Sequence, residues 1–267
     1  MSESTAHRPV AVVRNVPDSF ASCVTARPAI PPLDPLLARV QHAGYVSMLE
    51  EGGFSVIRVS TAEEHPDCVF IEDTAVVLGR RALLTSPGHP TRRGETAAVG
   101  AALAPLLEVE SMREGTIDGG DVLQAGGRVF VGLSRRTDPA GVAALTRFCA
   151  PVEVIPVRVR DTLHLKSGVS AVDAETVLWH PAACDRDDLE GMSVVEVAGD
   201  DPEAANVVRL PDGSVLVAAH FPATAELVVS LGHRVRTVGV SEFARADGGL
   251  TCLSVRLRSV IAVSSAS

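Results

Sequence analysis

Residues 120–134, GDVLQAGGRVFVGLS, contain two short alternating runs of apolar residues on either side of the turn Gly126-Gly127. This pattern is typical of a β-hairpin, because alternation with a period of two indicates a strand and paired glycines indicate a tight turn. Three further hairpins of the same kind are predicted, with turns at Gly79-Arg80, Asp173-Ala174 and Pro211-Asp212-Gly213. The chain therefore reads as a series of hairpins, not as a continuous sheet or a helical bundle.

The hairpins recur at a nearly constant interval. Helical stretches are predicted at residues 94–107, 138–150 and 222–232, and each is followed by one more short strand. Equivalent positions of successive units are 53, 43, 42 and 46 residues apart, at Val69, Val122, Leu165, Val207 and Leu253. A period in the forties indicates a repeated supersecondary unit.

Four units are complete, and the fifth is divided between the two ends of the chain. Residues 8–16, RPVAVVRNV, and residues 250–260, LTCLSVRLRSV, would pair to complete it and would leave no sheet edge exposed. We therefore predict an α/β fold, a five-bladed ββαβ propeller whose fifth unit is closed by the N- and C-terminal strands. No Gly-, Ser- or Pro-rich linker divides residues 1–267, so one domain is expected.

The overall composition restricts the class of partner. The 267 residues are 46% hydrophobic and carry a formal net charge of −9, which argues against a nucleic acid or an anionic membrane. The chain shows no secretory signal, no long apolar run and five scattered cysteines, so reduced thiols and a cytoplasmic location are expected. The common metal, phosphate and dinucleotide fingerprints are absent from the sequence.

Polar residues gather at the same end of every predicted unit. If the units form a ring, these ends converge on its axis and bring together Asp67, Glu72, Asp73, Asp118, Asp121, His164, Asn206 and Cys252. A lone Asp at such a place is usually a turn or cap, and a lone His is usually a satisfied polar residue. Their recurrence at equivalent positions favours a functional site.

The residue types at this site indicate a chemistry. A cysteine with a histidine forms a nucleophile with its acid/base, and a carboxylate near the histidine would fix its tautomer. Cys252 follows the turn Gly248-Gly249, which lets backbone pass close to another group. Further carboxylates beside a thiol make sense if the ligand is cationic, and a planar guanidinium could pair with Glu72 and Asp73.

Six stretches together resemble one known family. Residues 67–77, 87–96, 115–123, 131–138, 163–170 and 247–257 are similar, in order, to the dimethylarginine dimethylaminohydrolase family of the guanidine-modifying (pentein) superfamily. The resemblance runs from about residue 10 to residue 258 and implies a five-bladed ring of ββαβ units. It implies hydrolysis of Nω-methylated L-arginine to L-citrulline and a methylamine through a covalent cysteine intermediate, without a cofactor.

The resemblance also assigns roles to residues. Cys252 would attack the guanidinium carbon, His164 would protonate the leaving amine and then activate water, and Asp118 would orient His164. The expected substrate contacts are Asp67, Glu72 and Asp73 for the guanidinium, Arg92 and Arg136 for the α-carboxylate, and backbone near Thr25 and Ala246. Thr25 and Ala246 stand where the family has larger apolar residues.

The same resemblance implies a role for two segments outside these motifs. The Pro-rich residues 25–34 would belong to a loop that covers the site, and residues 259–267 would form a peripheral tail. Arginine deiminases share the chemistry but are much longer and carry a helical insertion, for which the hairpin spacing leaves no room.

Two alternative functions stay open. One is a related guanidino-acid hydrolase or deiminase with the same Cys/His mechanism. The other is a non-catalytic binding ring like the ribosome anti-association factors, which would have no need of Cys252, His164 and Asp118 together. The expected partner is a small guanidino amino acid, and the sequence carries no signal for an oligomeric state. Cys252 and His164 could also capture an inhibitory zinc ion.

Overall fold

The computed structural model describes residues 9–257, which form five three-stranded sheets. In four of them a hairpin is extended by a third strand that pairs in parallel with the second strand of the hairpin. The first two sheets contain β3 (Ala75–Leu78), β4 (Arg81–Leu84), β5 (Glu108–Ser111), β6 (Val122–Ala125), β7 (Arg128–Leu133) and β8 (Val154–Arg158). The next two contain β9 (Val169–Ala171), β10 (Thr176–Trp179), β11 (Ser193–Glu196), β12 (Val208–Arg209), β13 (Val215–Ala218) and β14 (Val235–Val238). The tail predicted for residues 259–267 lies outside the described residues.

The fifth sheet joins the two ends of the described chain. Its middle strand β1 (Val10–Arg14) pairs antiparallel with β15 (Val255–Leu257) and parallel with β2 (Ser55–Val59). Val12 lies opposite Val255 on one side and Ile57 on the other. The strand order is therefore that of the other four sheets, although its strands come from distant parts of the sequence.

Helices connect the second and third strands of four sheets. These are α1 (Pro35–Glu51), α2 (Thr96–Leu103), α3 (Pro139–Cys149) and α4 (Pro222–Ser230), and a further short helix is α5 (Ser241–Ala244). The sheet of β9, β10 and β11 differs from the predicted ββαβ unit, since only the 3-10 helix η6 (Arg186–Leu189) connects β10 to β11. The segment between these strands contains Pro181 and a run of charged residues, and it lacks a helical apolar face.

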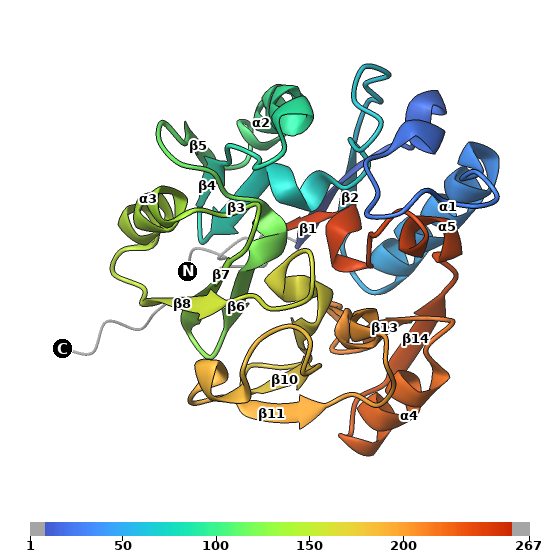
Figure 1. Cartoon of the computed structure of the whole chain (residues 1–267), viewed down its shortest axis with the longest axis vertical. Coiled ribbons are helices and arrows are strands. Elements are labelled where there is room, and N and C mark those ends of the chain that lie inside the picture. The colour runs from blue at the N-terminus through green and yellow to red at the C-terminus, as the bar shows by residue number, and fades with distance from the viewer. Residues whose placement is uncertain (1–8, 258–267) are drawn as a thin grey trace, which may run out of the picture.

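Each sheet packs against two neighbours through an apolar cluster. Val77 and Ala82 of the β3–β4 hairpin, for example, share a cluster with Val12 and Val255 of the fifth sheet. Four other clusters join the remaining neighbouring sheets in the same way. Figure 1 shows the sheets following one another around the middle of the molecule, from β3–β5 through β6–β8 and β10–β11 to β13–β14 and β1–β2.

The first strand of the hairpin around Gly79-Arg80 begins later than the sequence predicts. Residues 68–74, expected in a strand, form a turn and the 3-10 helix η2 (Ile71–Thr74), and β3 starts only at Ala75. The apolar run Val69-Phe70-Ile71 is buried on all sides and not alternately, and such a run does not distinguish a strand from another buried conformation. Similar turns precede the other hairpins, and the predicted site residues lie in or beside them.

Candidate active site

Five short 3-10 helices lie next to one another where the sheets meet. They are η2 (Ile71–Thr74), η4 (Gly119–Asp121), η5 (Leu165–Ser167), η7 (Pro202–Ala205) and η8 (Thr251–Leu253). The helix η2 contacts both η4 and η8, η4 contacts η5, and η5 contacts η7. Glu72, Asp73, Asp118, His164 and Cys252 all lie in these helices or directly before them. The structure therefore brings together residues that are up to 180 positions apart in the sequence.

Paired glycines permit this close approach. A Cβ atom at Gly120 would lie 2.6 Å from Nδ1 of His164 and 2.9 Å from Oδ1 of Asp73. A Cβ atom at Gly248 would lie 2.2 Å from the ring of Phe70. All three distances are shorter than real Cβ contacts, so any larger residue at either position would displace the site. The Gly-Gly turn before Cys252 thus serves close packing of backbone against the neighbouring unit.

A small cavity of about 30 Å³ marks the point where these side chains converge. Seven of the ten predicted site residues line it, namely Asp67, Asp73, Arg92, Arg136, His164, Ala246 and Cys252. Asp118 lies behind His164, whereas Glu72 and Thr25 are not among the lining residues. The predictions missed Val24, Phe70, Leu163 and Asp247, each of which lies within two residues of a predicted residue. Gly248 also lines the cavity and belongs to the turn identified before Cys252.

His164 is held by a ring of carboxylates. Its Nε2 lies 2.9 Å from Oδ2 of Asp118, which is fully buried, as the predicted orienting role requires. Burial by itself would lower the pKa of His164, but the negative charge of Asp73, the hydrogen bond to Asp118 and the charge of Asp121 outweigh it and raise the pKa to about 9. The imidazole is therefore cationic in the free protein near neutral pH.

Asp73 is bound by protein groups on both of its oxygens. Oδ1 accepts a hydrogen bond of 2.9 Å from the backbone N–H of Gly120, and Oδ2 pairs with the guanidinium of Arg92. Burial would raise the pKa of Asp73, but the positive charges of His164 and Arg92 lower it to about 2. Asp73 is thus a fixed negative charge beside the histidine.

Arg92 is more enclosed than a carboxylate-binding arginine would need to be. It is 4% exposed and donates to Glu95 at 3.0 and 2.8 Å and to the carbonyl of Phe70 at 2.8 Å, besides its pair with Asp73. Arg136 is more accessible and reaches Asp118 through a longer contact of 3.3 Å. Of the two arginines predicted to bind the α-carboxylate, only Arg136 keeps most of its donors free within the described residues.

Asp67 and Cys252 complete the cavity. The carboxylate of Asp67 accepts from the backbone N–H of Val24, with N–O distances of 3.1 and 3.4 Å. Burial, followed by the charges of Glu72 and Asp73, raises the pKa of the Cys252 thiol well above its usual range. The free protein therefore holds Cys252 as a thiol next to a cationic imidazole.

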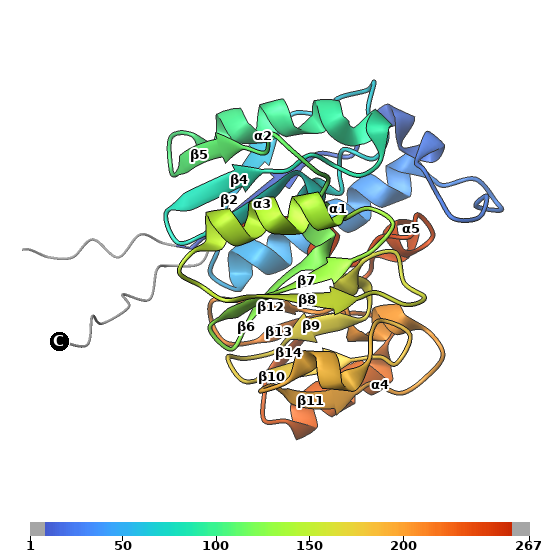
Figure 2. The same ribbon diagram turned by 60° about the vertical axis from the view of Figure 1, so that its left-hand side comes forward.

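Residues 23–34 cover this side of the molecule and are anchored near the cavity. The backbone N–H of Ala26 donates to Asp247, and that of Asp34 donates to Glu242 at 2.7 Å. Arg245 also donates to the carbonyl of Pro31. Figure 2 shows the segment between β1 and α1 projecting on the same side as α5. Of residues 23–34, only Val24 lines the cavity itself.

Three residues at the site carry potential metal ligands. Asp73, Asp118 and His164 bring one potential ligand atom each to within 4.8 Å of one another, but Cys252 does not belong to this group. Asp73 already pairs with Arg92, and Asp118 pairs with Arg136 and His164. The geometry therefore gives no support to the predicted inhibitory zinc at Cys252.

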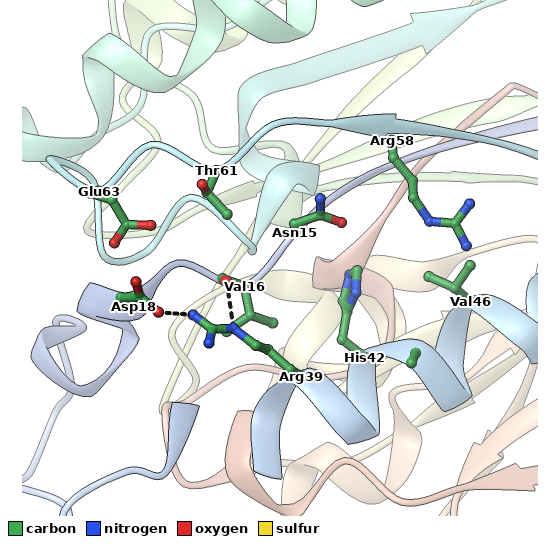
Figure 3. Close-up of a pocket in the computed structure, with 10 residues that line it drawn as sticks. Asn15, Val16, Asp18, Arg39, His42, Val46, Arg58, Thr61 and Glu63 are labelled. Atoms are coloured by element: carbon green, nitrogen blue, oxygen red, sulfur yellow. Dashed lines mark hydrogen bonds and ion pairs between the residues drawn. The ribbon is translucent and has the colours of Figure 1, made fainter. Parts of the chain in front are cut away.

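A larger cavity of about 490 Å³ lies elsewhere, between α1, the end of β1 and residues 58–63. Figure 3 shows Arg39, His42 and Arg58 facing it together with Asp18 and Glu63. None of the ten predicted site residues lines this cavity. In residues 9–257, no helix has both the length and the apolar character needed to cross a membrane.

The chain is similar to proteins of one enzyme group. Residues 58–205 match the family model described as arginine deiminase. An N(G),N(G)-dimethylarginine dimethylaminohydrolase of Streptomyces coelicolor is 42% identical over 228 residues, which cover 83% of this chain and 86% of the relative. The match to the family model includes Asp118 and His164 but ends before Cys252.

Solved structures agree with this similarity. A dimethylarginine dimethylaminohydrolase of Pseudomonas aeruginosa, a cysteine-to-serine variant in complex with citrulline, has a TM-score of 0.89 at 26% identity and covers 94% of this chain and 99% of its own. A histidine-to-glycine variant of a dimethylarginine dimethylaminohydrolase, in an adduct with S-methyl-L-thiocitrulline, has a TM-score of 0.87 at 27% identity. It covers 94% of this chain and 100% of its own.

Proposed function

The chain belongs to the dimethylarginine dimethylaminohydrolase family, and we propose that it hydrolyses Nω-methylated L-arginine to L-citrulline and a methylamine. The observation that carries this proposal is the meeting of Cys252, His164 and the buried Asp118 at one small cavity lined by further carboxylates. A thiol, an imidazole and an orienting carboxylate form a nucleophilic site. The additional negative charge selects a cationic substrate.

The first half of the reaction forms the covalent intermediate. The guanidinium enters beside Asp67, Asp73 and Glu72, and its positive charge lowers the pKa of the Cys252 thiol, which negative neighbours raise in the free protein. The thiol proton passes to solvent water, and the thiolate Sγ then forms a bond to the guanidinium carbon. The C–N bond to the methylated nitrogen breaks, and the leaving methylamine takes a proton from the His164 imidazolium.

The second half releases citrulline. Neutral His164 accepts a proton from water, and the oxygen attacks the carbon that is bonded to Sγ. The C–S bond breaks and Cys252 leaves as thiolate, which takes up the proton of the hydroxyl group, so the carbon keeps the oxygen as the C=O of the ureido group of citrulline. Asp118 holds Nε2 of His164 throughout, so Nδ1 is the nitrogen that transfers protons. The reaction uses a thiol, an imidazole and water, so we propose that no cofactor takes part.

We assign the amino-acid end of the substrate to the outer part of the cavity. Arg136 binds the α-carboxylate, since its guanidinium is the more accessible of the two candidates. Arg92 serves chiefly to neutralise Asp73 and Glu95 in this conformation. Backbone groups of Ala246 and of Val24, next to the predicted Thr25, line the cavity on the side of residues 23–34.

The architecture is part of the same proposal. We infer that the five sheets form a closed propeller and one catalytic domain, which is supported by the pairing of β1 with β15 and by an apolar cluster between each pair of neighbouring sheets. All five cysteines are free, as expected in a reducing compartment such as the cytoplasm.

A citrulline assay tests the function directly. Purified protein is incubated in parallel with asymmetric dimethylarginine, monomethylarginine and arginine, and citrulline and the released amine are quantified. The proposal predicts citrulline and one equivalent of methylamine or dimethylamine from the methylated substrates, with less product from arginine. Turnover of arginine alone would favour the deiminase alternative, and the absence of citrulline from all three would contradict both.

A further inference from the structure

The two carboxylate oxygens of Glu72 differ in their hydrogen bonding. Its carboxylate is buried, and Oε1 accepts from Nζ of Lys166 at 2.6 Å and from Nη2 of Arg256 at 3.1 Å. Within residues 9–257, the other oxygen, Oε2, is buried and has no hydrogen-bond partner. A buried charged oxygen without a partner is costly, so such an atom indicates a group that is satisfied by a ligand.

The other carboxylates predicted to bind the guanidinium differ in this respect. Both oxygens of Asp73 have protein partners, Gly120 and Arg92. Both oxygens of Asp67 lie within 3.4 Å of the backbone N–H of Val24. Of these three residues, only Glu72 keeps one oxygen entirely unpaired in the part of the chain that the structure describes.

Glu72 also lies close to the thiol. The helix η2, which carries Glu72, contacts η8, which carries Cys252. After burial, the charge of Glu72 makes the largest contribution to the raised pKa of Cys252. A guanidinium N–H that donates to Oε2 would therefore hold the guanidinium towards the helix that carries Cys252.

We propose that Lys166 and Arg256 are positioning residues, which bind Oε1 of Glu72 so that Oε2 is kept for a guanidinium N–H of the substrate. This inference rests on the proposed function of the site. Neither cation needs to touch the substrate, because each acts through Glu72. Both cations pair with the same oxygen of this buried carboxylate, Oε1.

Lys166 and Arg256 each lie in or shortly after a turn that carries a predicted catalytic residue. Lys166 lies in η5, two residues after His164, and its carbonyl accepts from Nδ2 of Asn206 at 2.8 Å. Arg256 lies in β15, four residues after Cys252, and donates to Oγ of Ser254 at 2.9 Å. A displacement of either catalytic turn would therefore also displace Glu72.

A double-mutant cycle tests whether Lys166 acts through Glu72. The variants Glu72→Gln, Lys166→Met and the combination of both are compared with wild type for kcat/KM on dimethylarginine. In the Cys252→Ser background, the Kd of dimethylarginine is compared in the same way. Each single variant is expected to lose roughly 10–150-fold, the range of a hydrogen bond to a charged group, and the double variant little more than Glu72→Gln alone. Lys166→Arg, which keeps a donor and the charge, is expected to recover most of the loss.

A matched control separates positioning from a general loss of an ion pair. Arg81→Met removes a cation that lies 2.6 Å from Glu110 and lies outside both cavities. It is expected to leave kcat/KM within about twofold, in line with the small contribution of exposed ion pairs. Thermal midpoints of all variants show which of them are folded, and Arg256→Met repeats the test at the second cation.

The outcomes separate this inference from the proposed function. Losses that multiply fully in the double variant, or Lys166→Met with wild-type kcat/KM and Kd, would overturn the positioning role. Wild-type protein that releases no citrulline would overturn the proposed function. The cycle measured by binding would still decide whether Lys166 acts through Glu72, because binding of the guanidinium needs no turnover.

Discussion

His42 and His164 are both almost completely buried, yet their surroundings shift their pKa values in opposite directions. His42 lines the larger cavity, where burial and the charge of Arg58 lower its pKa to about 4. His164 lines the smaller one, where three aspartates outweigh burial and raise its pKa to about 9. Burial alone therefore does not produce an acid/base group. The neighbouring charges decide whether a histidine is held neutral or cationic.

The two cavities differ in volume and in how deeply their charged residues are buried. The larger one encloses about 490 Å³, but the side chains of Asp18 and Arg58 that line it are 81% and 50% exposed. The smaller one encloses about 30 Å³, and its central charges are almost fully buried. Volume would select the larger cavity, whereas convergent buried groups with shifted pKa values select the smaller one. We consider the second criterion the better guide in this protein.

Replacement of the nucleophile is expected to have the largest effect. Cys252→Ala should lower kcat/KM for dimethylarginine by several orders of magnitude, because it removes the covalent step, while the protein stays folded. Citrulline release and the thermal midpoint are the measurements. Cys68→Ala serves as control and should stay within about tenfold of wild type, since Cys68 is buried and absent from both cavities. Residual activity of Cys252→Ala within the same tenfold would remove Cys252 as the nucleophile.

The sequence predicted the parts of the fold that depend on local chemistry. The turn at Gly126-Gly127 connects β6 to β7 as expected, and Asp173 caps its own turn by accepting from Glu175 and Thr176. The 3-10 turns before the hairpins were missed, because apolar runs such as Val69-Phe70-Ile71 are buried on all sides in either conformation.

The site was predicted as a set of residues but not as a set of pairs. The motifs identified Asp118, His164 and Cys252, and the structure adds the contact between the first two. The pairing of Glu72 with Lys166 and Arg256 joins residues 94 and 184 positions apart. No local pattern indicates such a pairing, because it depends on how the units are arranged around the axis.

A paired substitution of the two histidines tests the comparison directly. His164→Gln should lower kcat by roughly 10²–10⁴-fold, the usual effect of removing a general acid/base. His42→Gln should leave kcat within about twofold, because no described contact joins His42 to the smaller cavity. Steady-state kinetics on dimethylarginine measure both. A large loss of kcat in His42→Gln that leaves folding intact would show that the larger cavity takes part in catalysis.

Neutralising one carboxylate should have a smaller effect. Asp73→Asn removes the charge that pairs with Arg92 and faces His164, and we expect a loss of about 1.5–3 kcal/mol, or roughly 10–150-fold in kcat/KM. The pKa of His164 should fall at the same time, which an NMR titration of the imidazole would detect. An unchanged kcat/KM would place the guanidinium elsewhere in the cavity.

The opposite pKa shifts also predict opposite effects of pH on stability. The raised pKa of His164 contributes stability that is complete below pH 6.5 and is lost as the pH rises through about 9. The lowered pKa of His42 makes the free energy of unfolding fall as the pH falls from 6.5 towards 4. Each slope should be at most about 1.4 kcal/mol per pH unit.

Denaturant unfolding across this range measures both slopes. His164→Gln should flatten the loss between pH 6.5 and 9, and His42→Gln should flatten the loss between pH 6.5 and 4. Wild-type and His164→Gln proteins with the same slope above pH 6.5 would show that His164 is not held cationic in the folded state.

Mass spectrometry of the trapped intermediate tests the covalent role of Cys252 most directly. Wild-type protein is mixed with dimethylarginine, quenched in acid during steady-state turnover, and examined as intact protein and as peptides. The account predicts an adduct whose mass equals dimethylarginine less dimethylamine, confined to the peptide that contains Cys252 and absent after Cys252→Ser substitution. An enzyme that turns over dimethylarginine while its adduct maps to another cysteine, or whose Cys252→Ser variant still forms one, would contradict it.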